Sequence, residues 1–210
     1  MATRQEIEGY VAEPSETITV EHKSWLDLAD EADRAKLAKA AMALANSGGG
    51  AIVIGFREDN QDGRHLQSER RPEAIDRYGS DSVNAAVGRY ARPSFHCDVY
   101  HAEDPVTGNE HAVVIVPGDH RTPIMTIRDC ERVLGQNKVY VRKPGPKSED
   151  ARTPEEWSQV LDRCLRARRD DMLEAFRVIM AGSVEGSAQP GLVDDPLQDF
   201  VARAEDRWAT

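Results

Sequence analysis

The stretch LANSGGGAIVIG, residues 44–55, decides the fold of this chain. An alanine- and leucine-rich segment precedes it, so a helix is expected from a cap at Asp30 to about Asn46. The Asn-Ser-Gly run then ends that helix. Residues 51–56 are apolar on both faces, which predicts a central strand. A helix that leads directly into a buried strand indicates an α/β or α+β domain.

A second informative block, ETITVEHK, occupies residues 16–23. Its alternation predicts a strand over 17–23, on which Glu21 and Lys23 share one face. Glu16 lies five residues before Glu21, so it reaches the same side only if the chain turns or bulges near Pro14 and Ser15. A carboxylate beside an ammonium at a sheet edge suits a metal nuclease, since the carboxylate holds a divalent cation and the lysine stabilises phosphoryl charge. The alternative is an exposed strand with a salt bridge.

These two blocks, in this order, resemble the Schlafen AlbA_2 family, formerly described as divergent ATP-binding domains. The family pattern is Glu-x4-Glu-x-Lys, a helix, Asn-(Ser/Thr)-Gly-Gly-Gly, an apolar strand and an acidic turn. The late segment from Tyr140 to Arg142 also resembles a family strand. The resemblance implies a bacterial Schlafen-like protein, in which Glu16, Glu21 and Asp59 hold Mg²⁺ or Mn²⁺ and Lys23 acts on the phosphate.

The chain departs from the family pattern at three positions. His22 stands where the family often has an apolar residue, and Asn60 replaces a common glycine. Glu58 precedes Asp59, which leaves open which of the two acids faces the site. Taken as an exposed carboxylate, Glu21 contributes little to stability. Glu21→Ala is therefore expected to remove cleavage and leave the fold intact.

Composition limits the functional class. The chain has 210 residues and a net charge of −10, which argues against a generally adhesive nucleic-acid binder. The charge is uneven, however, because residues 138–169 hold nine Lys or Arg against five Asp or Glu, and residues 183–210 hold two against six. No apolar run approaches the roughly 20 residues needed to span a bilayer, and the N-terminus has no apolar signal region. A cytoplasmic protein without a membrane partner is therefore expected. The three cysteines are far apart and predict neither disulfides nor a zinc site.

The remaining elements follow from short signals. A helix from residue 80 or 81 to about 90, a hairpin over 94–101 and 110–117, and a strand over 138–142 are expected. Thr153, Pro154 and Glu156 form a capping box that opens a long helix, which Gly182 can end. The domain is therefore expected over 8–182, followed by an acidic, weakly ordered tail over 183–210.

Other candidates concern nucleic-acid contact. The glycine run has no P-loop pattern, and it precedes a strand, so close packing is favoured over a phosphate cradle. Arg166 and Arg169 lie three apart and can contact successive phosphates; a solvated helix face is the alternative. The predicted nucleic-acid contacts are Lys23, Asn46, Ser47, Gly48, Gly49, Arg142, Lys143, Arg166 and Arg169.

The sequence and the resemblance together predict a nucleic-acid-processing protein, most concretely a metal-dependent endonuclease acting on RNA of the tRNA type. The alternatives are a non-catalytic regulator that binds RNA or DNA and an ATP-binding accessory module. Family nuclease cores have two similar lobes arranged as a cradle, and this chain has one. A homodimer is therefore expected.

Overall fold

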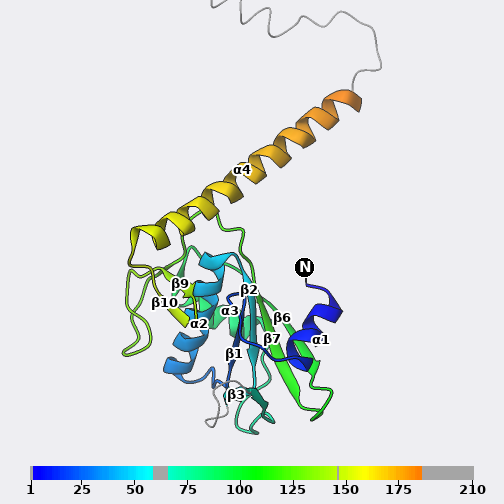
Figure 1. The fold of residues 1–210 in the computed structure, drawn as a ribbon, viewed down its shortest axis with the longest axis vertical. Coiled ribbons are helices and arrows are strands. Elements are labelled where there is room, and N and C mark those ends of the chain that lie inside the picture. The colour runs from blue at the N-terminus through cyan, green and yellow to red at the C-terminus, as the bar shows by residue number, and fades with distance from the viewer. Residues whose placement is uncertain (1, 59–65, 146, 186–210) are drawn as a thin grey trace, which may run out of the picture. The chain divides into compact units, whose positions relative to one another are not determined.

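The computed structural model describes residues 2–58, 66–145 and 147–185 (Figure 1). The chain divides into two compact units, residues 1–168 and 169–210. The helices are α1 (Arg4–Ala12), α2 (Glu31–Ser47), α3 (Ser80–Gly88) and α4 (Pro154–Glu185). The strands are β1 (Val20–Lys23), β2 (Gly50–Ile54), β3 (Phe56–Glu58), β4 (Leu66–Ser68), β5 (Ala91–Arg92), β6 (Asp98–Glu103), β7 (Glu110–Val116), β8 (Met125–Thr126), β9 (Tyr140–Lys143) and β10 (Lys147–Asp150).

A four-stranded mixed sheet in the order β1-β2-β7-β6 forms the centre of the first unit. β1 runs parallel to β2, with Glu21 opposite Ile52, and β2 pairs antiparallel with β7. β6 and β7 form the expected hairpin. β1 is thus an edge strand, and its partner β2 is buried in the middle of the sheet. The α+β class expected from the sequence is confirmed.

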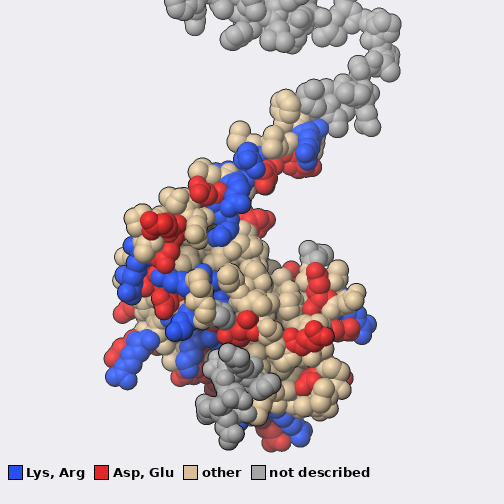
Figure 2. All heavy atoms as spheres, in the orientation of Figure 1, with Lys and Arg blue, Asp and Glu red and all other residues tan. Residues whose placement is uncertain are grey.

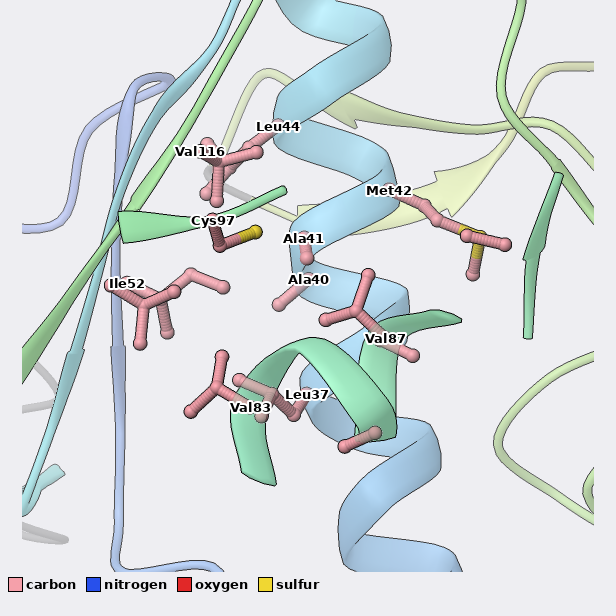
Figure 3. Packing of buried hydrophobic residues seen from close by; sticks show 14 of the residues in the cluster. Leu37, Ala40, Ala41, Met42, Leu44, Ile52, Val83, Val87, Cys97 and Val116 are labelled. Atoms are coloured by element: carbon pink, nitrogen blue, oxygen red, sulfur yellow. The ribbon is translucent and has the colours of Figure 1, made fainter. Parts of the chain in front are cut away.

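Helices cover both faces of this sheet (Figure 1). On one face, α2 and α3 pack against the β2 and β7 residues Ile52, Ile54 and Val114. Figure 3 shows Leu37, Ala41 and Leu44 of α2 within this cluster, together with residues of the sheet and of α3. On the other face, Ile7 and Val11 of α1 pack against the residues that alternate with the first set. Alternation along β2 therefore supplies two cores at once, as expected for a strand that is apolar on both sides.

The chain passes from α2 to β2 through a close backbone contact. Gly48 ends α2 in the left-handed conformation, with φ of 104°. A Cβ atom on Gly49 would lie 2.8 Å from the carbonyl oxygen of Val116 and 2.9 Å from the amide nitrogen of Gly118. Only glycine allows this approach, so the run packs the helix end against the loop after β7. This agrees with the packing role that the sequence favoured.

Several element boundaries differ from expectation. α3 begins at Ser80 after an N-cap at Gly79, and the strand expected over 51–56 is interrupted at Gly55, which separates β2 from β3. α1 and β10 were not predicted. Gly182 does not end α4, which continues to Glu185. Helix ends are weakly specified when no capping partner competes with continued helix formation.

The start of α4 is as predicted. The Thr153 hydroxyl accepts from the Glu156 N–H at 3.3 Å, and the Glu156 carboxylate accepts from the Thr153 N–H at 3.1 Å. Val160 and Cys164 of α4 pack on Val139 and Val141 around β9, forming a third small core. Within the residues that the structure describes, no helix is long and apolar enough to cross a membrane.

The second unit begins inside α4 at Arg169. Its described helical segment exposes a set of large apolar side chains, which are Met172, Leu173, Phe176, Val178 and Ile179. The expected tail over 183–210 lies almost entirely outside the described residues.

Candidate functional site

Glu21 lies on the edge strand β1 and is nevertheless buried, with 4% of its surface exposed. Its Oε1 pairs with the Lys23 ammonium at 2.5 Å. Its Oε2 accepts from Arg142 Nη1 at 2.6 Å and from the Ser148 hydroxyl at 2.9 Å. The expectation that Glu21 is an exposed carboxylate is therefore wrong, because β9 and β10 bring Arg142 and Ser148 over the edge of β1.

Arg142 is the residue that holds this arrangement together. Its side chain is completely buried, and its Nη2 donates to the carbonyl oxygen of Thr17 at 2.9 Å. Weaker bonds run from its guanidinium to the carbonyls of Ile18 at 3.3 Å and Val20 at 3.4 Å. A buried charge is tolerated when it is both paired and hydrogen-bonded. All of these bonds are internal, so the predicted groove residue Arg142 has its guanidinium occupied within the fold.

Glu16 reaches the same region through a turn. The Thr17 N–H donates to the carbonyl oxygen of Val20 at 3.0 Å, and this turn lets Glu16 Oε1 accept from the His22 N–H at 3.1 Å. Burial raises the pKa of the Glu16 carboxyl; the His22 N–H opposes this effect, and the charge of Glu21 adds to it. The chain turn that the sequence required for Glu16 is present, although it lies at residues 17–20.

One cavity of about 520 Å³ joins these groups. Glu16, Glu21 and Lys23 line it from β1 and the preceding turn. Its other charged lining residues are Lys36, Lys39, Arg132, Lys147 and Glu149. Five basic side chains thus face three acidic ones in a chain whose net charge is −10. The cavity concentrates positive charge around two carboxylates, an arrangement that suits a phosphate-bearing ligand.

The third predicted metal ligand, Asp59, lies outside the described residues, as does Asn60 of the same turn. The choice between Glu58 and Asp59 depends on this segment. Among residues 2–58, 66–145 and 147–185, no three Asp, Glu, His or Cys side chains gather closely enough to hold a metal ion. The described part of the predicted ligand set is therefore the pair Glu16 and Glu21.

Asn46 and Ser47, two predicted nucleic-acid contacts, have partners inside the protein. The Asn46 amide donates to the carbonyls of Ile124 and Tyr140, both at 2.9 Å, and accepts from the Ile124 N–H at 2.8 Å. Asn46 is 4% exposed. The Ser47 hydroxyl accepts from the Arg142 N–H at 2.8 Å. These contacts join the end of α2 to β9, so the Asn-Ser pair orients the strand that carries Arg142.

Four other predicted nucleic-acid contacts, Gly48, Gly49, Lys143 and Arg166, are not among the residues that line the 520 Å³ cavity. The Arg163 side chain packs beside Gly48, and Gly49 is buried against the loop after β7. Lys143 pairs with Glu156 at 2.7 Å and with Glu149 at 3.6 Å. Arg166 is exposed on α4, and Arg169, in the second unit, pairs with Asp170 at 3.3 Å.

Sequence reasoning missed four basic residues of the cavity. Lys36 and Lys39 lie three apart on α2, so they share one side of the helix, and this spacing was a usable signal. Arg132 comes from an irregular segment and Lys147 from β10. No strand was expected in the polar β10 sequence, so its position beside β1 had no local signal.

The sequence matches one protein-family model and has similarity to solved structures. The Schlafen, AlbA_2 family model matches residues 16–150. The DIP2311 protein from Corynebacterium diphtheriae is 17% identical over 73% of this chain, with a TM-score of 0.48, and the chain spans 31% of that protein's length. The N-terminal domain of a RecG-related protein from Nitrosomonas europaea is 16% identical over 73% of this chain and 94% of its own length, with a TM-score of 0.41. No curated protein matches the chain. The family match covers well over half of the sequence and contains β1, β9 and β10, the three strands that meet at Glu21, and on this basis the chain belongs to the Schlafen AlbA_2 family.

Proposed function

We propose that this protein is a metal-dependent endonuclease acting on RNA, and that the cavity at Glu21 is its active site. The observation that supports the proposal is the convergence of Glu16, Glu21 and Lys23 on one basic cavity. Two carboxylates and an ammonium in a cavity lined by further basic side chains suit phosphodiester cleavage better than they suit binding alone.

The donor chemistry fits Mg²⁺ or Mn²⁺, since both ions prefer carboxylate oxygens. In this proposal Glu16, Glu21 and Asp59 hold the ion, which would supply Lewis acidity at the phosphate and a nucleophilic water. Glu21 Oε2 is held by Arg142 and Ser148, so Oε1 is the atom available to a cation, in exchange for Lys23.

Lys23 has a second task in this scheme. Its side chain is 32% exposed, and both Lys23 and Glu21 line the cavity. Released from Oε1, the ammonium can stabilise the negative charge that develops on a transferring phosphoryl group. Arg142 and Ser148 act as positioning residues, because they hold the Glu21 carboxylate in place after the Lys23 ammonium has moved away from it.

The test uses Glu16→Gln, since the variant amide can still accept from the His22 N–H and the Glu21–Arg142 pair stays intact. We expect wild-type protein to cut single-stranded RNA or tRNA with Mn²⁺ and not with EDTA, and Glu16→Gln to lose at least a hundredfold in rate. Glu103→Gln, on the exposed end of β6, is the matched control and should cut normally. Wild-type protein that binds RNA and never cuts it with any divalent cation refutes the nuclease proposal in favour of a non-catalytic regulator.

We also propose that the protein is a homodimer, as expected for a one-lobed member of a family with two-lobed cores. The exposed apolar side chains of α4 support this, because contiguous apolar surface on a soluble domain favours a partner. The ATP-binding alternative has no such support: the glycine run packs against the loop after β7.

A further inference from the structure

Four basic residues that line the cavity come from separate elements, and the carboxylate of Glu149 lines it as well. Lys36 and Lys39 come from α2, Arg132 from the segment before β9, and Lys147 from β10. Figure 2 shows Lys and Arg gathered over the side of the molecule that carries α2, β9 and β10, with Asp and Glu more frequent on the side of α1 and β6.

Two of these four cations have no acidic partner within the part of the chain that the structure describes. Lys36 pairs with Asp33 at 2.7 Å, and Arg132 pairs with Glu131 at 3.7 Å. Lys39 and Lys147 form no ion pair with any residue in the described ranges 2–58, 66–145 and 147–185. An ammonium that lines a cavity without a carboxylate partner is available to an anionic ligand.

Lys39 is also held in place. It is half-buried, and its Nζ lies 5.2 Å from the centre of the Tyr140 ring. A lysine over an aromatic face loses less freedom on binding an anion than one in open solvent. Tyr140 is itself fixed, because its carbonyl accepts from Asn46 and its hydroxyl accepts from the Gly135 N–H. The fold therefore presents one oriented cation on α2 and a second, exposed one on β10.

We propose that Lys39 and Lys147 bind two further phosphates of the strand whose cleaved phosphate lies at Glu16, Glu21 and Lys23. The inference rests on the proposed function and deepens it, since it names the ligand as an internal segment of a polynucleotide. A nucleoside monophosphate has a single phosphate and cannot engage both lysines through phosphate. The volume of about 520 Å³ lies in the range of about 300–1,000 Å³ that is typical of ligand sites.

The test is equilibrium binding of a short fluorescent single-stranded RNA in EDTA, measured by anisotropy over a series of salt concentrations. For single strands, each phosphate contact contributes about 0.7 to the slope of log affinity against log salt. Lys39→Gln and Lys147→Gln should each lower the slope by about 0.7, and the double variant by about 1.4. Lys138→Gln is the matched control, because Lys138 is outside the cavity lining and pairs with Asp150 at 3.5 Å.

Two further measurements separate the possible failures. Lys39→Arg should keep the wild-type slope, which distinguishes lost charge from a disturbed fold. Adenosine monophosphate should compete weakly and without dependence on either lysine. If both glutamine variants bind RNA with the wild-type salt slope, this inference is overturned and the proposed function stands. If the wild-type protein binds no RNA, both are overturned.

Discussion

Replacing Glu21 with alanine should destabilise the protein substantially. The substitution removes the carboxylate that accepts from Arg142 at 2.6 Å and leaves a fully buried guanidinium without its counter-charge. The cost arises from the charge that remains, since a buried ion pair itself adds little net stability. The same argument applies to Glu21→Gln, which loses the charge and replaces one of the two acceptor oxygens with an amide NH2 donor.

The magnitude follows from what Arg142 retains. Breaking a buried pair by removing one partner typically costs about 3–5 kcal/mol. The carbonyls of Thr17, Ile18 and Val20 remain as acceptors, which places the expected loss near the lower end, at about 3 kcal/mol. For a chain of this size each kcal/mol lowers Tm by about 2–4 °C, so Glu21→Ala should melt about 6–12 °C below wild type.

The assay is thermal and urea unfolding followed by circular dichroism. Glu149→Ala is the control, because Glu149 is exposed and its pair with Lys143 at 3.6 Å should contribute less than about 1 kcal/mol. The double variant Glu21→Leu with Arg142→Met should recover much of the loss, since it removes both charges together. A Glu21→Ala protein that melts within about 2 °C of wild type would show that Arg142 does not depend on this carboxylate.

Three other predictions concern stability and assembly. Burial lowers the pKa of the His22 imidazole to about 4 in the folded protein. As the pH drops from about 6.5 to about 4, the unfolded chain therefore binds a proton that the folded protein does not, and stability should fall. In urea titrations, His22→Phe should flatten that profile. Phe176→Glu should convert the proposed dimer to a monomer by light scattering, whereas Val106→Glu, at an 87% exposed hairpin position, should not; a monomeric wild type at micromolar concentration would refute the dimer. Thr153→Ala should cost about 1 kcal/mol and Ser158→Ala much less, because only Thr153 caps the α4 N-terminus; equal melting temperatures for the two variants would contradict this role.

Short sequence patterns predicted those features of the fold that are formed by residues close together in the chain. Asp30 caps α2 and Gly48 ends it, and the capping box at Thr153 opens α4, as the sequence indicated. Each of these features involves residues only a few positions apart. The alternation of apolar residues likewise predicted the hairpin of β6 and β7.

The site was harder to predict, because its chemistry depends on contacts between distant segments. Strand periodicity showed that Arg142 and Lys143 face opposite ways but not which of them is covered. The structure buries Arg142 against a carboxylate 121 residues earlier and leaves Lys143 at the surface. The sequence wrongly predicted an exposed Glu21 for the same reason, because no local pattern indicates that β10 lies over this edge strand.

Chain order in the Arg142 contacts has a consequence for biosynthesis. The guanidinium holds the segment from Thr17 to Glu21, yet it belongs to a strand that leaves the ribosome more than 120 residues later. Until residues 140–148 have emerged, Glu21 has neither Arg142 nor Ser148 to fix it, so a nascent or truncated chain contains the carboxylates without an ordered site. The cleavage proposed for this protein would therefore be confined to chains that extend past Ser148, and shorter translation products would be inert.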